Sequence, residues 1–172
     1  MKFKSLVLAM ILALSMLAAG CASTTTAKVG TAPDGSELAI EKATIKFMKD
    51  TQAGGYQVVS TTDLNKWVTE KKDMIIIDTM PAENFAKGHI PGAVNAELPK
   101  TTMADATDEQ KAAFIKLLGT DKNKTIVVYC GFVGCARSDL GASIAIQQGF
   151  TNVYRLPGGI VSWQEAKYNV EK

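Results

Sequence analysis

Two cysteines, Cys130 and Cys135, are the residues of this sequence best suited to covalent chemistry. Cys130 directly follows the apolar run of residues 126–129 (IVVY), which is typical of a buried strand. A loop of small residues then leads to Arg137 and Ser138, which open a segment with helical spacing. A thiol at such a junction faces free N–H groups and the positive end of a helix dipole, which lower its pKa. The pattern therefore predicts a nucleophilic thiolate at Cys130, in a site that handles an anion.

The second cysteine, Cys135, has three interpretations. It could be a resolving thiol that attacks a modified Cys130, because thiol exchange needs a nearby thiolate. It could be half of a structural disulfide, which an oxidising compartment favours. It could also be a small buried apolar residue, a common environment for a free cysteine. Cys130 is the better nucleophile of the two, since it alone directly follows the strand.

Strand and helix patterns alternate from residue 56 onward, and these elements have to position the two thiols. Strands are expected at residues 57–60, 74–77, 94–98, 126–129 and 152–156. Helices are expected after a cap at Thr61 or Thr62, after Pro81, at residues 107–118, after Arg137 and after Gly159. This order predicts an α/β fold of three layers, with a central mostly parallel sheet flanked by helices. Ligands bind such sheets beyond the carboxyl ends of the strands, where Cys130 lies.

A further helix is predicted before this domain. Its apolar positions form a modest stripe, expected to pack against the outside of the domain: Leu38, Ala43, Ile45, Phe47 and Met48. The chain is thus expected to have four parts: a signal peptide of the lipoprotein type at residues 1–20, a flexible tether at 21–36, an N-terminal helical extension at 37–55 and the α/β domain at 56–172.

The N-terminus has the pattern of an export signal. Two lysines precede an apolar stretch at residues 6–17, which is shorter than a membrane span. The LAAGC that follows resembles a bacterial lipobox, in which Cys21 is lipidated, although Ala18 stands where a Leu is usual. Ordinary secretion with cleavage nearby is the alternative. We expect a protein on the periplasmic face of a membrane, whose membrane contact is limited to its lipid anchor.

The composition is that of one globular domain without a strong net charge. The 172 residues are 47% apolar and 21% charged, with a net charge of +2. Lys2 and Lys4 account for this excess, because 17 basic residues face 17 acidic ones once residues 1–20 are set aside. The balance gives no electrostatic basis for binding nucleic acid. His89 is the only histidine and the methionines are scattered, so we expect no metal site and no cofactor.

Three groups of short stretches resemble the signatures of a single rhodanese-like domain. They are IIID at 75–78 with GHIPGA at 88–93, VVYC at 127–130 with Arg137 and Ser138, and GFTNVY at 149–154 with LPGGI at 156–160 and Trp163. Each stretch alone is a weak indication, whereas their order and spacing together are specific.

The resemblance implies a sulfurtransferase in which the Cys130 thiolate takes a sulfane sulfur from a donor such as thiosulfate or a polysulfide. The resulting persulfide passes its sulfur to a thiophilic acceptor, so the implied partners are a small sulfur-containing anion and a thiol. By position, the substrate-binding loop comprises Gly131, Phe132, Val133, Gly134, Ala136, Arg137 and Ser138. Convergent N–H donors of such a loop would stabilise an anionic sulfur.

The loop also departs from the family pattern. Arg137 lies seven residues after Cys130, farther than in the family's common loop or in the related phosphatase-type loop. Met80 stands where an Arg is usual. Two other functions therefore stay open: a non-catalytic sulfur carrier or interaction module, and a thiol-dependent phosphatase or oxyanion reductase.

Overall fold

The computed structural model describes residues 36–172, and Ala39–Lys172 form one compact unit. The expected signal peptide, Cys21 and the tether as far as residue 35 lie outside the described residues. Within residues 36–172, no helix is both long enough and apolar enough to cross a membrane.

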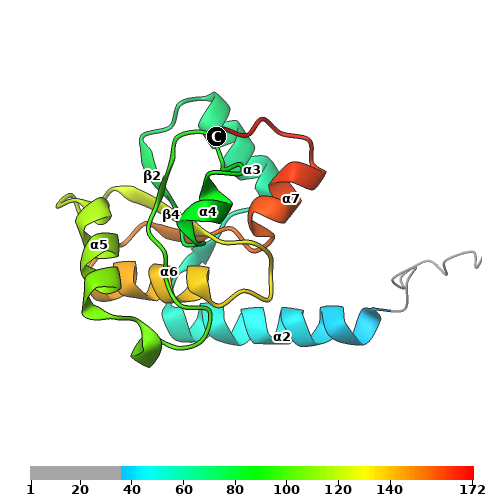
Figure 1. The fold of residues 1–172 in the computed structure, drawn as a ribbon, viewed down its shortest axis with the longest axis horizontal. Helices are drawn as coiled ribbons and strands as arrows, with labels where there is room; N and C mark the ends of the chain where they lie inside the picture. The colour runs from blue at the N-terminus through cyan, green and yellow to red at the C-terminus, as the bar shows by residue number, and fades with distance from the viewer. Residues whose placement is uncertain (1–35) are drawn as a thin grey trace, which may run out of the picture. The chain divides into compact units, whose positions relative to one another are not determined.

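A sheet of five parallel strands forms the centre of the domain (Figure 1). The strands are β1 (Gln57–Val58), β2 (Met74–Asp78), β3 (Ala93–Asn95), β4 (Thr125–Tyr129) and β5 (Val153–Arg155). Their order is β1-β5-β4-β2-β3, so β4 lies in the middle between β5 and β2. This architecture confirms the predicted α/β fold and gives Cys130, the residue after β4, a central position.

Helices cover both faces of the sheet. They are α2 (Glu37–Gly54), α3 (Thr61–Thr69), α4 (Ala82–Phe85), α5 (Asp108–Leu118), α6 (Arg137–Gln147) and α7 (Gly159–Glu165), with a 3-10 turn at Met103–Asp105. α3, α4 and α7 pack into one core cluster, whereas α5 and α6 pack into the cluster on the other face (Figure 1). The C-terminal end of α2 lies beside α6, where Gly54 approaches Ser143.

Alternating side chains of β4 explain why helices are needed on both faces. Ile126 and Val128 point into the cluster beneath α5 and α6. Val127 and Tyr129 point into the cluster beneath α3 and α7, because consecutive residues of a strand face opposite sides. All four side chains are completely buried. The loop after β4 therefore starts from the most firmly packed strand of the sheet.

The helix starts follow from local capping. Ser60 caps α3, because its hydroxyl accepts the N–H of Asp63. The predicted cap at the threonines that follow Ser60 is therefore wrong by one or two positions. At α5, Thr107 and Gln110 form a capping box, which confirms the helix start predicted from the sequence.

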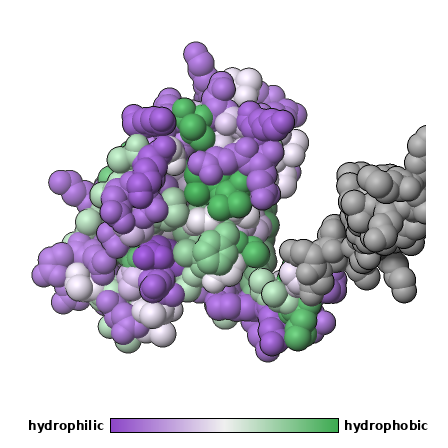
Figure 2. Space-filling model, turned by 45° about the vertical axis from the view of Figure 1, so that its right-hand side comes forward, coloured by the Kyte–Doolittle hydropathy of each residue, from purple (hydrophilic) through white to green (hydrophobic). Residues whose placement is uncertain are grey.

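The N-terminal helix α2 presents a different face to the domain than the sequence predicted. Leu38, Ile45 and Met48 are 61%, 44% and 64% exposed, so this part of the predicted stripe is wrong. The partly buried positions of its second half are Phe47, Asp50, Thr51 and Gly54. The helix takes this orientation because Phe47 stacks on the buried Arg155. Apolar side chains consequently remain on the outer side of α2, at the lower right of Figure 2.

Candidate active site

Cys130 lies immediately after the central strand β4 and is almost completely buried. Its carbonyl oxygen accepts the N–H of Ile160 at 2.9 Å, and the carbonyl oxygen of Gly131 accepts the N–H of Val161 at 3.1 Å. These donors belong to the first turn of α7, whose N–H groups have no partner within the helix. The start of α7 therefore fixes the main chain around the thiol.

Gly159 permits this close approach of α7. Its φ is +57°, and a Cβ at this position would lie 2.1 Å from the carbonyl oxygen of Cys130. Both conditions require a glycine. The LPGGI stretch of the sequence thus has a physical purpose, because it brings the first turn of α7 against Cys130.

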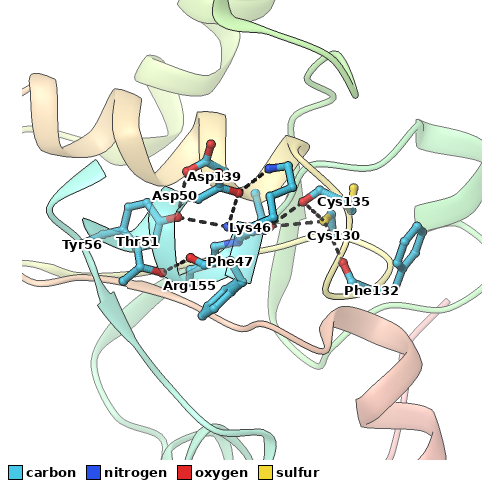
Figure 3. Close-up of polar contacts among 11 residues, drawn as sticks. Lys46, Phe47, Asp50, Thr51, Tyr56, Cys130, Phe132, Cys135, Asp139 and Arg155 are labelled. Atoms are coloured by element: carbon cyan, nitrogen blue, oxygen red, sulfur yellow. Dashed lines mark hydrogen bonds and ion pairs between the residues drawn. The ribbon is translucent and has the colours of Figure 1, made fainter. Parts of the chain in front are cut away.

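Oxygen atoms surround the sulfur of Cys130 (Figure 3). Ser138 Oγ lies 3.2 Å from Cys130 Sγ, while the carbonyl oxygens of Cys135 and Phe132 lie at 3.6 and 3.9 Å. Carbonyl oxygens only accept hydrogen bonds, so they can bond the protonated thiol and not the thiolate. The buried Ser138 hydroxyl is the group among these three that can donate to an anionic Cys130.

Burial raises the pKa of the Cys130 thiol well above its usual range, and the hydrogen bond to Cys135 raises it further. The expectation that the loop and the helix start lower the pKa of Cys130 is therefore wrong. The physical reason is burial, which outweighs the lowering effect of the Ser138 hydroxyl and N–H on Cys130, whereas the N–H groups of Gly131 and Arg137 act on Cys135.

The surroundings of the thiol pair consequently favour ionisation of Cys135 over that of Cys130. The hydrogen bond from the Cys130 thiol lowers the pKa of Cys135 to about 5, and the N–H groups of Arg137 and Gly131 act in the same direction. At neutral pH the pair therefore holds one proton and one negative charge. Both thiols are free, and movement of the shared proton toward Cys135 makes Cys130 the thiolate.

Most of the predicted loop residues contribute only their backbone. The loop positions without a polar side chain are Gly131, Phe132, Val133, Gly134 and Ala136. Phe132 closes a turn by accepting the N–H of Cys135 at 3.0 Å, and its ring is 58% exposed. Met80 lies against the loop, since its sulfur is 3.5 Å from where a Cβ on Gly131 would stand. Met80 therefore packs against the start of the active-site loop.

Arg137 is the first residue of α6 and lies beside Cys135. Its guanidinium helps to lower the pKa of Cys135. Its Nε is buried and has no hydrogen-bond acceptor within the protein. Arg137 therefore places a positive charge, with one unpaired N–H, beside the sulfur of Cys135.

Arg155, the last residue of β5, belongs to the site but was not identified from the sequence. Its side chain is completely buried, and it donates to Ser138 Oγ and to the carbonyl oxygen of Cys135, each at 2.9 Å. The alternation of β5 carries a signal for it, because Val153 and Arg155 flank Tyr154 and so face the same side. A charged residue at an inward position indicates a buried polar network.

Asp78 and His89 organise the neighbouring loops. Asp78 Oδ1 accepts the N–H of Met80 at 2.8 Å, and burial raises the pKa of this carboxyl group. The His89 ring stacks on Phe85 at 3.7 Å, and its Nδ1 lies 3.0 Å from the Phe85 carbonyl oxygen. In the part of the chain that the structure describes, no three His, Cys, Asp or Glu side chains are grouped to hold a metal ion.

Sequence comparison identifies related proteins. A family model described as the rhodanese-like domain matches residues 60–166, more than half of the chain. The thiosulfate sulfurtransferase GlpE of Shewanella oneidensis is 33% identical over 99 residues, which are 58% of this chain and 84% of that protein. A tRNA uridine(34) hydroxylase of Bdellovibrio bacteriovorus is 28% identical over 107 residues, which are 62% of this chain. The chain matches only 28% of the length of that hydroxylase.

Solved structures share the same fold. The solution structure of the polysulfide-sulfur transferase homodimer from Wolinella succinogenes has a TM-score of 0.55 and 23% identity, covering 76% of this chain and 90% of that chain. The crystal structure of BH2092 from Bacillus halodurans has a TM-score of 0.54 and 24% identity, covering 77% of this chain and 85% of that chain. At these identities the likeness concerns the fold alone.

Proposed function

The chain belongs to the rhodanese-like domain family, and on that basis we propose that it is a sulfurtransferase acting through a persulfide on Cys130. The donor is a sulfane-sulfur anion such as thiosulfate or a polysulfide, and the acceptor is a thiophile such as a thiol. The observation that most supports this proposal is the buried free thiol of Cys130 at the end of the central strand, with the Ser138 hydroxyl oxygen 3.2 Å from its sulfur and a second free thiol, Cys135, in the same loop. The similarity to a thiosulfate sulfurtransferase over most of that relative's length agrees with it.

In the first step, Cys135 acts as the base. Its thiolate takes the proton of Cys130, and the Cys130 thiolate attacks the outer sulfur of thiosulfate. The sulfur–sulfur bond of the donor breaks, and sulfite leaves with the bonding electron pair. The product is a persulfide anion on Cys130, and the Ser138 hydroxyl, 3.2 Å from Cys130 Sγ in the unmodified protein, is placed to donate to it.

In the second step, an acceptor thiolate or cyanide attacks the terminal sulfur of this persulfide. The Cys130 thiolate leaves and recovers its proton from Cys135. Resolution by Cys135 is a competing route, in which Cys135 attacks Cys130 Sγ and releases sulfide. That route forms a Cys130–Cys135 disulfide, and an external thiol must supply two electrons before the next cycle.

The test uses purified protein with thiosulfate and cyanide. We expect thiocyanate formation by the wild type and no formation by Cys130→Ala. After donor treatment, mass spectrometry should find a peptide about 32 Da heavier at Cys130. Full activity of Cys130→Ala together with loss of activity in Cys135→Ser would assign the nucleophile to Cys135. The adduct without turnover would indicate a sulfur carrier.

For the site of action, we propose export and lipid anchoring through Cys21. The support is the sequence pattern alone: a basic start, an apolar stretch at residues 6–17 and the lipobox-like LAAGC. In a bacterial host, the wild type should partition with membranes and Cys21→Ala should not. Equal partitioning of the two proteins would contradict the anchor.

A further inference from the structure

Arg155 is a cation placed behind the active-site loop without access to solvent. A charge in such a position is unfavourable unless nearly all of its donors are paired. Its partners come from three different parts of the chain, and they connect the loop after β4 to the N-terminal helix α2 (Figure 3). Arg155 thus contacts Ser138 and Cys135, two of the residues that surround the Cys130 sulfur.

Two of these contacts hold the loop. Arg155 Nε donates to Ser138 Oγ at 2.9 Å, and Arg155 Nη2 donates to the Cys135 carbonyl oxygen at 2.9 Å. Because a guanidinium can only donate, Ser138 Oγ has to be the acceptor in the first bond. The hydroxyl hydrogen of Ser138 is thereby left for another acceptor, and Cys130 Sγ lies 3.2 Å away. Arg155 thus orients the hydroxyl toward the sulfur.

The other contacts hold Arg155 itself. Arg155 Nη1 donates to the Tyr56 hydroxyl at 3.0 Å and faces Asp50 Oδ2 at 3.6 Å. The Tyr56 hydroxyl in turn donates to Asp139 Oδ1 at 2.7 Å. The ring of Phe47 covers the guanidinium, with its centroid 4.7 Å from Cζ. With these partners the guanidinium has one preferred position.

We propose that Arg155 is a positioning residue for sulfur transfer, which directs the Ser138 hydroxyl toward the Cys130 sulfur and is itself held by α2. This proposal rests on the proposed sulfurtransferase function. Asp50 and Phe47 precede residues 60–166, the part that the family model matches. The N-terminal helix is therefore part of the support of the active site. The charged groups around the thiol pair and its support are Lys46, Asp50, Asp78, Arg137, Asp139 and Arg155.

The experiment compares Arg155→Lys, Arg155→Met and Ser138→Ala in the full chain. We expect kcat to fall at least about tenfold in Arg155→Met and Ser138→Ala, with KM for thiosulfate changed less than about threefold. Arg155→Lys keeps the charge without the planar fork, so it should recover part of the loss. Lys66→Met is the matched control, because Lys66 is an exposed cation on α3, and it should behave as the wild type.

A second measurement does not depend on sulfur transfer. In a Cys135→Ser background, iodoacetamide alkylation of Cys130 is followed against pH. Adding Ser138→Ala or Arg155→Lys should move half-maximal alkylation to higher pH, because the anionic sulfur loses a donor. If the wild type has no transferase activity, this shift still tests the positioning role while the proposed function fails.

The double variant Ser138→Ala/Arg155→Lys tests whether Arg155 influences kcat through the Ser138 hydroxyl. Its loss of kcat should be clearly smaller than the product of the two single losses, because Arg155 acts mainly through that hydroxyl. Multiplied losses would overturn the proposal, and so would wild-type kcat and an unchanged alkylation profile in Ser138→Ala. If Arg155→Met does not fold, Ser138→Ala and Arg155→Lys decide the question.

Discussion

Asp50 Oδ2 of α2 lies 3.6 Å from Nη1 of Arg155, so a carboxylate of the N-terminal helix faces the cation behind the thiol pair. This relationship predicts the direction in which the pH dependence of thiol alkylation shifts when Asp50 loses its charge. Asp50→Asn keeps an oxygen for Arg155 but removes the negative charge that offsets it. The thiol pair then experiences more positive charge, and its alkylation should begin at lower pH than in the wild type.

Arg155→Met removes the cation and should move the alkylation profile in the opposite direction, to higher pH. Asp108→Asn is the control for Asp50→Asn, because Asp108 is a fully exposed carboxylate on α5. Shifts of the same sign for the Asp50 and Arg155 variants would show that charge does not carry the effect.

The thiol pair predicts which cysteine reacts first. Since the pKa of Cys135 is about 5 and burial raises that of Cys130, the thiolate present between pH 6 and 8 is that of Cys135. Limited treatment with iodoacetamide at about pH 6, followed by peptide fragmentation, should find the label on Cys135. Preferential labelling of Cys130 would place the resting charge on the other sulfur.

Gly159→Ala tests the packing of α7 against Cys130. The new methyl group would meet a carbonyl oxygen at 2.1 Å, and the positive φ adds strain, so we expect a loss of about 3 kcal/mol or more in the free energy of unfolding. Gly92→Ala is the matched control, because its φ is +76° and a Cβ there meets nothing within 4 Å. The control should lose only about 1–2 kcal/mol. Equal losses in urea denaturation would mean that strain alone matters.

Asp78 predicts a pH dependence of stability. Burial raises its pKa in the folded state, so its contribution is fully present below the unfolded pKa of about 4 and is lost as pH rises through the folded value. Asp78→Asn keeps the acceptor for Met80 and has no charge to bury. We expect the variant to be about 1 kcal/mol more stable than the wild type at pH 7, with this advantage vanishing toward pH 4.

Urea denaturation at several pH values measures this difference. A variant that is less stable than the wild type at pH 7 would mean that the ionised carboxylate is well stabilised by its surroundings.

The sequence pattern around Cys130 was sufficient to predict its position at the carboxyl end of a buried strand. The apolar run at 126–129 identified the central strand, and the order of strands and helices identified a parallel sheet with the thiol at its carboxyl edge. These features depend on periodicity and turn residues within short stretches. The family resemblance rested on the same stretches, and the family is confirmed.

The charge distribution of the site could not be predicted from short stretches of sequence. Whether the N–H groups of Gly131 and Arg137 point to Cys130 or to Cys135 depends on the path of the loop in three dimensions. Arg155 illustrates the same limit. Its inward position follows from strand alternation, but its partners Asp50 and Ser138 lie far away in the sequence. The outer face of α2 was mispredicted because a buried arginine, and not an apolar stripe, determines its docking.

The position of α7 sets an order of assembly for the active site. During synthesis both cysteines leave the ribosome before α7, whose N–H groups later hold the carbonyl oxygens of Cys130 and Gly131. Until that helix docks, the carbonyl oxygens of Cys130 and Gly131 lack the two donors that hold them in the finished domain. The main-chain geometry on which the proposed sulfur transfer depends is therefore complete only once α7 has docked.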